Sequence, residues 1–341
     1  MLPELAEFED IILQSGPLLR VKQHGEVAVG SARLPLYSAS LGSEKPDAPV
    51  LGFFAGVHGL ERIGSQVLLA FLRSLLVRLR WDSSLQRKFE TIRLVFMPLV
   101  NPAGMALGTR SNAEGVDLMR NAPIDALEKT PFLLGGHRIS PKLPWYRGKP
   151  DAGMARENLA LCKVVQEELF CSPFSIALDC HSGFGLCDRV WFPYAYTRTP
   201  IQHLPEIHAL KSLFDQTYPH HPYVIEPQAR QYLTHGDVWD YLYQLSRQPG
   251  TGVSGRVFLP LTLELGSWLW IKKNPRQLLS LLGMFNPVVP HRRQRVLRGH
   301  LLLLEFLVRA VHDNARWLPD EIERIDHLRL AESLWYSGIR K

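Results

Sequence analysis

The spacing of apolar residues along the chain predicts alternating strands and helices. Short, nearly continuous apolar runs at 50–57, 91–100 and 175–180 are typical of strands that are buried on both faces of a sheet. Between the first two runs, apolar residues recur every three or four positions over 63–80, which predicts a helix. Further strands are expected at 190–195, 223–227 and 257–265, and further helices at 157–169, 276–282 and 295–312.

Two other segments complete the predicted architecture. Residues 25–30 and 33–40 predict a hairpin, and 122–156, rich in Pro and Gly, predicts a long ordered loop. The alternation favours an α/β fold with a mixed, mostly parallel twisted sheet and helices on both faces. Because no break in composition and no repeat interrupts the chain, we expect one catalytic domain over 1–341. It would carry an N-terminal hairpin extension (about 20–45) and C-terminal helices (about 290–341).

Composition places the chain among globular proteins and suggests a reducing compartment. Of 341 residues, 46% are hydrophobic and 21% are charged, which argues against a disordered chain. The N-terminus carries acidic residues instead of a secretory signal, and no apolar run reaches the ~18 residues of a membrane span. We therefore expect a cytoplasmic protein without a membrane partner. Its four cysteines form no C-x-x-C pair and are expected to be reduced, buried side chains: Cys162, Cys171, Cys180 and Cys187.

The net charge of +6 changes this picture only slightly. It weakly favours acidic substrates. Lys and Arg are scattered and no nucleic-acid-binding motif occurs, so no nucleic-acid partner is expected. The densest basic run, at 291–295, is interpreted as a solvated loop and helix start rather than a phosphate-binding site.

The strand at 50–57 ends directly in His58-Gly59-Leu60-Glu61, a candidate metal site. A His and a Glu three residues apart in a tight turn can offer a nitrogen and an oxygen to one zinc ion, or can simply form a capping pair. His181 follows the strand at 175–180 and is the candidate third ligand, with Asp179 available to support its ring. A second H-x-x-E, at His203, follows no strand and predicts only a surface helix.

Five short motifs in order resemble the zinc metallocarboxypeptidase (carboxypeptidase A-like) superfamily. They are H-G-x-E at 58–61, N-P-x-G at 101–104, R-x-N-x-x-G-V-D-L-x-R-N at 110–121, D-x-H-S-G at 179–183 and T-x-E-x-G at 262–266. The start of the first motif also resembles bacterial intracellular branches. These include the succinylglutamate desuccinylase and aspartoacylase amidohydrolases, which share the fold and the zinc site.

The resemblance implies an α/β/α sandwich with one Zn²⁺ per chain on His58, Glu61 and His181. It also implies residue roles. Glu264, an acidic residue in an apolar run, would be the general base, or alternatively a strand-end Glu facing solvent. The candidate oxyanion donor is Arg110, and the candidate substrate-binding residues are Arg120, Asn121 and Tyr232. One position departs from the family pattern, because Met119 stands where an Asn normally helps Arg120 to hold the terminal carboxylate.

These observations predict a zinc-dependent hydrolase of an amide (peptide) bond, most similar to a carboxypeptidase. Two alternatives stay open: a zinc amidohydrolase of small N-acyl amino acids, and a non-catalytic family member that binds peptides. The expected partner is therefore a peptide or an N-acyl amino acid. The chain lacks the G-x-S-x-G motif of serine hydrolases and the glycine-rich motifs of nucleotide-binding proteins.

Overall fold

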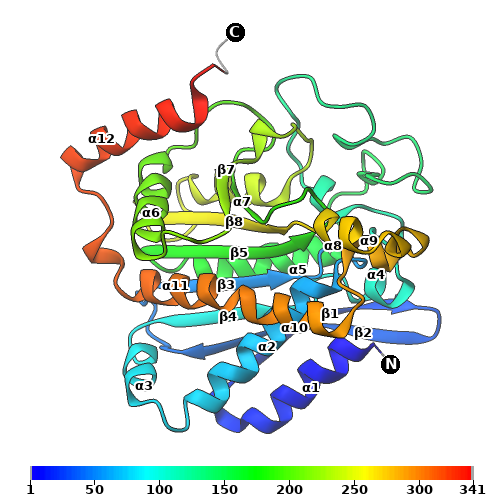
Figure 1. The fold of residues 1–341 in the computed structure, drawn as a ribbon, viewed down its shortest axis with the longest axis horizontal. Coiled ribbons are helices and arrows are strands. Elements are labelled where there is room, and N and C mark those ends of the chain that lie inside the picture. The colour runs from blue at the N-terminus through cyan, green and yellow to red at the C-terminus, as the bar shows by residue number, and fades with distance from the viewer. Residues whose placement is uncertain (1, 339–341) are drawn as a thin grey trace.

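A computed structural model describes residues 2–338 and contains one eight-stranded mixed sheet (Figure 1). The strand order is β1-β2-β4-β3-β5-β8-β6-β7. The four central strands are parallel, β2 is antiparallel to both β1 and β4, and β6 is antiparallel to β8. The strands are β1 (Arg20–Val29), β2 (Ala32–Gly42), β3 (Val50–Ala55), β4 (Arg93–Met97), β5 (Phe174–Ser182), β6 (Arg189–Phe192), β7 (Val224–Pro227) and β8 (Val257–Leu265).

Helices cover both faces of this sheet, which confirms the expected fold class. Figure 1 shows α2, α10 and α11 in front of the strands and α5 and α7 behind them. The helices are α1 (Pro3–Ser15), α2 (Arg62–Arg78), α3 (Ser83–Phe89), α4 (Pro102–Leu107), α5 (Arg156–Val164), α6 (Leu204–Thr217), α7 (Val238–Ser246), α8 (Trp268–Lys273), α9 (Leu281–Phe285), α10 (Pro290–Gly299), α11 (Leu301–His312) and α12 (Glu321–Ala331).

Aromatic packing fixes α2 against the centre of the sheet. The ring of Phe53 on β3 lies 5.5 Å from that of Phe71 on α2 and 5.0 Å from that of Phe96 on β4. All three side chains are fully buried, and truncating such a Phe to Ala costs about 3–5 kcal/mol. This packing holds α2, which begins at the turn that follows β3, against the centre of the sheet.

Two late elements differ from the sequence-based expectation. The helix expected at 276–282 is a 3₁₀ turn (Pro275–Leu279) followed by the short α9, and the helix expected at 295–312 is divided into α10 and α11. The division falls at His300, whose buried ring bonds the Tyr223 hydroxyl at 2.9 Å. The expected C-terminal helices reach into 339–341, which lie outside the described residues.

Two expectations from composition can be compared with the described residues. Cys162 and Cys180 are buried as expected, whereas Cys171 and Cys187 are partly exposed, and all four are free thiols. Within 2–338, none of the helices combines the length and the apolar character needed to cross a membrane.

Candidate metal centre

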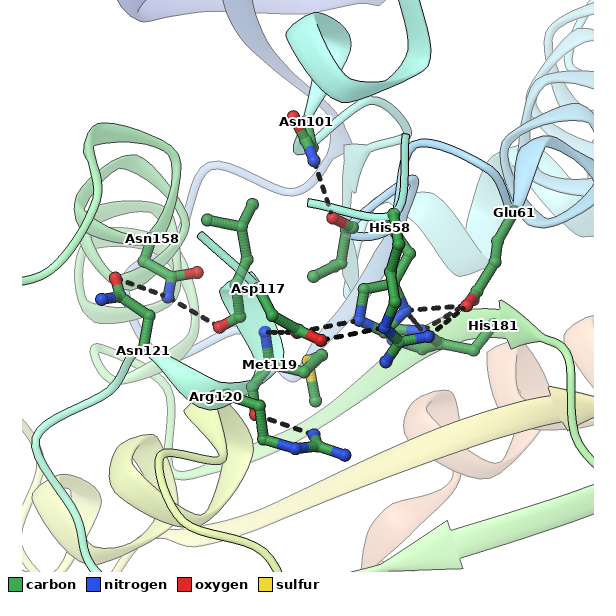
Figure 2. A network of polar contacts seen from close by, with 12 residues as sticks. His58, Glu61, Asn101, Asp117, Met119, Arg120, Asn121, Asn158 and His181 are labelled. Carbon is green, nitrogen blue, oxygen red and sulfur yellow. Dashed lines mark hydrogen bonds and ion pairs between the residues drawn. The ribbon is translucent and has the colours of Figure 1, made fainter. Parts of the chain in front are cut away.

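Three residues from two distant parts of the chain converge at the end of the central strands (Figure 2). His58 Nδ1 lies 2.8 Å from Glu61 Oε1, and His181 Nδ1 lies 3.0 Å from Glu61 Oε2. The two Nδ1 atoms are 3.3 Å apart, and all three side chains are buried. The sequence had singled out these same residues as candidate zinc ligands.

The turn between β3 and α2 positions His58 and Glu61, and the N-P-x-G segment braces this turn. Asn101 donates from Nδ2 to the Val57 carbonyl at 3.1 Å and accepts at Oδ1 from the Gly104 amide at 2.8 Å. A Cβ on Gly59 would lie 2.0 Å from the Gly104 carbonyl carbon, so only glycine allows this close approach. The motif at 101–104 is thus structural support for the motif at 58–61.

Strand register brings His181 and Glu264 to the same edge. On β5, Cys180 lies beside Ala55 of β3, so the residue after it reaches the turn that carries His58. On the other side of β5, His181 lies directly beside Glu264 of β8. Parallel strands end at a common edge, which explains why chemistry-bearing residues from three strands meet here.

Each histidine is oriented by a carboxylate at its other ring nitrogen. His58 Nε2 lies 3.2 Å from Asp117 Oδ1, and His181 Nε2 lies 2.7 Å from Asp179 Oδ2. Trp239 donates to the same Asp179 oxygen at 2.8 Å. A neutral ring that donates its single proton from Nε2 to this carboxylate presents the lone pair of its Nδ1 to Glu61.

These protonation states leave three acceptors facing one another: two Nδ1 atoms and the Glu61 carboxylate. Without a cation this arrangement is repulsive, and it raises the pKa of His181. Burial opposes that rise, but the charges of Asp179 and Glu61 outweigh it. Ligand atoms that share one tetrahedral zinc at about 2.0–2.2 Å lie about 3.3–3.6 Å apart, slightly more than the 2.8–3.3 Å found here. The donor set therefore fits a zinc ion with three protein ligands.

Arg110 connects the two carboxylates that surround His58. Its Nε donates to Asp117 Oδ2 at 2.9 Å and its Nη1 to Glu61 Oε1 at 3.3 Å. Burial opposes the guanidinium charge, but the carboxylates of Asp117 and Glu61 raise the pKa of Arg110 above its usual value. A permanent positive charge therefore lies beside the candidate metal ligands.

A pocket of about 570 Å³ opens onto the three candidate ligands and is otherwise mostly apolar. Glu264 lines it and is only 7% exposed. Burial, together with the nearby charge of Glu61, raises the pKa of Glu264 to about 8. Among the aromatic residues, Phe184, Trp191 and Tyr232 contact one another at ring-centre distances of 5.2–6.3 Å.

Arg120 also lines this pocket and is buried. Its Nε donates to the Leu134 carbonyl at 3.2 Å and its Nη1 to the Met119 carbonyl at 3.1 Å. Its Nη2 is buried and has no hydrogen-bond partner among residues 2–338. An unsatisfied guanidinium N–H in a pocket is costly unless a ligand accepts from it.

Tyr232 reaches the same part of the pocket because its segment packs against Arg120. A Cβ on Gly236 (φ +71°) would lie 1.9 Å from the Arg120 carbonyl oxygen, so the two backbones touch here. Burial raises the pKa of the Tyr232 hydroxyl, although the charges of Arg120 and Arg110 oppose this.

Asn121, the remaining candidate for substrate binding, lies elsewhere. Its Nδ2 donates to the Arg147 carbonyl at 2.8 Å and its Oδ1 accepts from the Ala155 amide at 2.6 Å. It is not among the described residues that line the pocket. Asn121 therefore anchors the long loop before α5, and its position gives no support to a substrate contact.

The second H-x-x-E differs from its expected surface position. His203 and Glu206 are 4% and 2% exposed because α12 packs over the start of α6. His203 Nδ1 bonds the Tyr243 hydroxyl at 3.0 Å, and Glu206 forms an ion pair with Arg324 of α12. Neither belongs to the metal-ligating cluster found within 2–338.

The chain is similar to known proteins in both sequence and fold. Residues 19–251 match the family model described as zinc carboxypeptidase, so the chain belongs to this family of zinc-dependent hydrolases. It is 24% identical over 186 residues to carboxypeptidase D from Anas platyrhynchos, and 33% identical over 75 residues to carboxypeptidase SOL1 from Arabidopsis thaliana. These alignments cover 51% and 22% of this chain, but only 11% and 15% of the relatives' lengths.

Solved structures show the same fold. The carboxypeptidase A from Helicoverpa armigera superposes with a TM-score of 0.68 at 15% identity, over 90% of this chain and 72% of that chain. Thrombin-activatable fibrinolysis inhibitor gives a TM-score of 0.66 at 17% identity, over the same shares of the two chains.

Asp117 was missed by the sequence analysis, and its contact with His58 gives a first prediction. Replacing it with Asn should weaken zinc affinity by about 10- to 100-fold, because the amide no longer fixes the ring and its proton as the carboxylate does. A competition titration against a chromophoric chelator measures the affinity. The matched control is Asp326→Asn on the exposed face of α12. Equal zinc affinities for the two variants would contradict the supporting role of Asp117.

Proposed function

We propose that the protein is a zinc-dependent metallocarboxypeptidase with one zinc held by His58, Glu61 and His181. The observation that carries this proposal is the convergence of three acceptors on one buried point beside a pocket. The same pocket contains a buried carboxyl group and an unsatisfied guanidinium, which are the groups needed to move a proton and to hold a carboxylate.

Zinc in such a site supplies Lewis-acid chemistry: it makes a water molecule a stronger acid and polarises the substrate carbonyl. The carboxylate of Glu264 takes the proton of the attacking water. The water oxygen bonds to the carbonyl carbon, and Glu264 then passes the proton to the leaving amine nitrogen as the C–N bond breaks. A cation next to Glu61 offsets the charge that raises the pKa of Glu264, which favours the carboxylate form.

Arg110 is proposed to stabilise the negative charge that forms on the carbonyl oxygen. The hydrogen bonds to Asp117 and Glu61 fix its guanidinium beside the site before substrate arrives. A preorganised donor of this kind contributes about 3–4 kcal/mol to catalysis when its loss is measured.

Arg120 is proposed to hold the carboxylate of the substrate through its Nη2 group. The apolar and aromatic lining, which includes Trp191 and Phe184, then favours an apolar side chain on the terminal residue. Tyr232 lies beside Arg120 and is proposed to contact the same substrate end.

A panel of substrates tests this function. Blocked dipeptides with Phe, Leu, Arg or Glu at the free C-terminus are compared with N-acetyl and N-succinyl amino acids, each with and without a chelator. We expect chelator-sensitive release of terminal Phe and Leu. Cleavage of the N-acyl amino acids alone would instead support a deacylase related to the desuccinylase branch. Turnover of neither class by the zinc-loaded protein would contradict the proposal.

Met119 gives a second prediction, on recognition of the C-terminus. Its side chain lines the pocket next to Arg120 but cannot donate a hydrogen bond. Met119→Asn should lower KM for peptides with a free α-carboxylate by about 10-fold, as expected for one added hydrogen bond to a charged group. The same peptides with an amidated C-terminus are the control. An unchanged KM ratio between free and amidated peptides would show that residue 119 does not determine specificity.

A further inference from the structure

One segment of the surface carries an uninterrupted positive charge. Residues 265–304 contain seven of the 39 Lys and Arg residues of the chain and none of its 33 Asp and Glu residues. This leaves 32 Lys and Arg against 33 Asp and Glu elsewhere, so the segment accounts for the whole net charge of +6. Within 2–338, none of its seven basic side chains forms an ion pair. Six of them are exposed: Lys272, Lys273, Arg276, Arg293, Arg295 and Arg298.

The same segment exposes several large apolar side chains. Leu279 is 90% exposed, the highest value among the large hydrophobic residues of the described chain, and Leu281 is 63% exposed. The apolar members are Trp268, Leu278, Leu279, Leu281, Leu282 and Val288. A soluble surface rarely gathers this many without a partner. We call the exposed residues of 268–298 the basic apolar face.

The segments that carry this face contact one another and adjoin the candidate active site. In Figure 1, α8 and α9 lie side by side, and Arg292 at the start of α10 donates to the carbonyls of Trp270 and Lys273 on α8. A hollow of about 480 Å³ in this face is lined by Trp268, Ile271, Lys272, Leu278, Met284 and Phe285. Three of these, Trp268, Met284 and Phe285, also line the pocket of the metal centre.

We propose that the basic apolar face docks the protein onto an anionic lipid bilayer. Tryptophan and leucine side chains enter the interfacial region of a bilayer, and surrounding Lys and Arg bind its anionic headgroups. An acidic polypeptide would match the charge but would leave the protruding Leu279 and Leu281 uncovered, whereas a bilayer matches both properties. Such an interfacial contact needs no membrane-spanning helix, and the proposal differs here from the sequence-based expectation of a protein without a membrane partner.

The consequence concerns the orientation of the pocket. Because Trp268 belongs to the basic apolar face and also lines the pocket, docking places the mouth of the pocket next to the lipid surface. The protein would then act on substrates at that surface rather than in the bulk solution. This orientation does not depend on which amide bond is cleaved.

Sedimentation of the protein with vesicles tests the proposal. Wild-type protein should bind vesicles of phosphatidylglycerol and phosphatidylcholine, but not vesicles of phosphatidylcholine alone, and binding should weaken as salt is raised. Lys272→Glu/Arg276→Glu should lower the partition coefficient by roughly 25-fold or more, at about fivefold for each basic residue lost. Leu279→Ser/Leu281→Ser should also lower it, at unchanged net charge.

Matched controls come from other parts of the surface. Arg80→Glu/Arg87→Glu, near α3, reverses two exposed charges, and Leu13→Ser removes a leucine that is 83% exposed on α1. These variants should bind like the wild type. Equal binding by face and control variants, or equal binding to neutral and anionic vesicles, would overturn the proposal. The proposal would also be overturned if the wild type did not bind vesicles but bound polyglutamate through the same residues.

Discussion

Glu264→Gln should lower kcat by about 10²- to 10⁴-fold while the protein keeps its zinc. Glutamine has the shape of the carboxyl group but cannot accept and return a proton, and general acid–base catalysis contributes a factor of this size. Glu264 lies beside His181 in the strand register but is not one of the three clustered ligands, so the metal should stay bound. Steady-state kinetics on the preferred peptide and elemental analysis of the same sample measure the two quantities.

The matched control for this substitution is Glu90→Gln, at an exposed position after α3. Its kcat and zinc content should equal those of the wild type. A Glu264→Gln enzyme with near-normal kcat and one zinc per chain would remove Glu264 from the proposed mechanism. A variant that lost its zinc would instead show that Glu264 holds the metal site together.

Much of the fold could be predicted because its core strands are buried on both faces. Continuous apolar runs such as the one that contains Phe53 need no partner information to be recognised. The helices differ in how clearly their apolar spacing appears in the sequence. The period is clear in α2, which packs along the sheet, but α12 is polar on most sides and its main signal is a capping box. Asp320 accepts from the Glu323 amide, and the Glu323 side chain accepts in return from the Asp320 amide.

The break between α10 and α11 shows where periodicity alone fails. The apolar spacing continues through His300, but this residue is buried and hydrogen-bonded to Tyr223, which lies 77 positions earlier in the chain. Only the tertiary contact identifies the end of one helix and the start of the next. The same limit applies to His203 and Glu206, whose burial depends on the packing of α12 over α6.

The candidate metal ligands could be predicted because each follows a buried strand, and strand ends share one edge of the sheet. Supporting residues carry no such signal. Asp117 lies in an irregular loop, and Trp239 on α7 reaches Asp179 from 60 positions away. The carboxylate at 117 could have been suspected from its place between Arg110 and Arg120, since a buried acid near two cations needs a specific partner.

Residue type was also an uncertain guide to the role of polar side chains in the long loop. Asn121 and Arg120 are neighbours in sequence, yet the side-chain amide of Asn121 is hydrogen-bonded to the backbone of the loop. One guanidinium nitrogen of Arg120, by contrast, has no partner in the described part of the chain. Which of two adjacent polar groups faces a pocket depends on the path of the loop, and the sequence does not specify that path.

His181→Ala should abolish zinc binding and reduce amide hydrolysis to the background rate. Two ligands cannot replace the three that a catalytic zinc site uses. Zinc that binds only the folded state stabilises it by about 4 kcal/mol at a concentration 1,000 times Kd. Added zinc should therefore raise the Tm of the metal-free wild type by several degrees and leave that of His181→Ala unchanged. Calorimetry and elemental analysis measure both effects.

His220→Ala, at an exposed position after α6, is the control and should respond like the wild type. If His181→Ala kept one zinc per chain and the same rise in Tm, the three-ligand site would be wrong, because the ion would then be held by other residues.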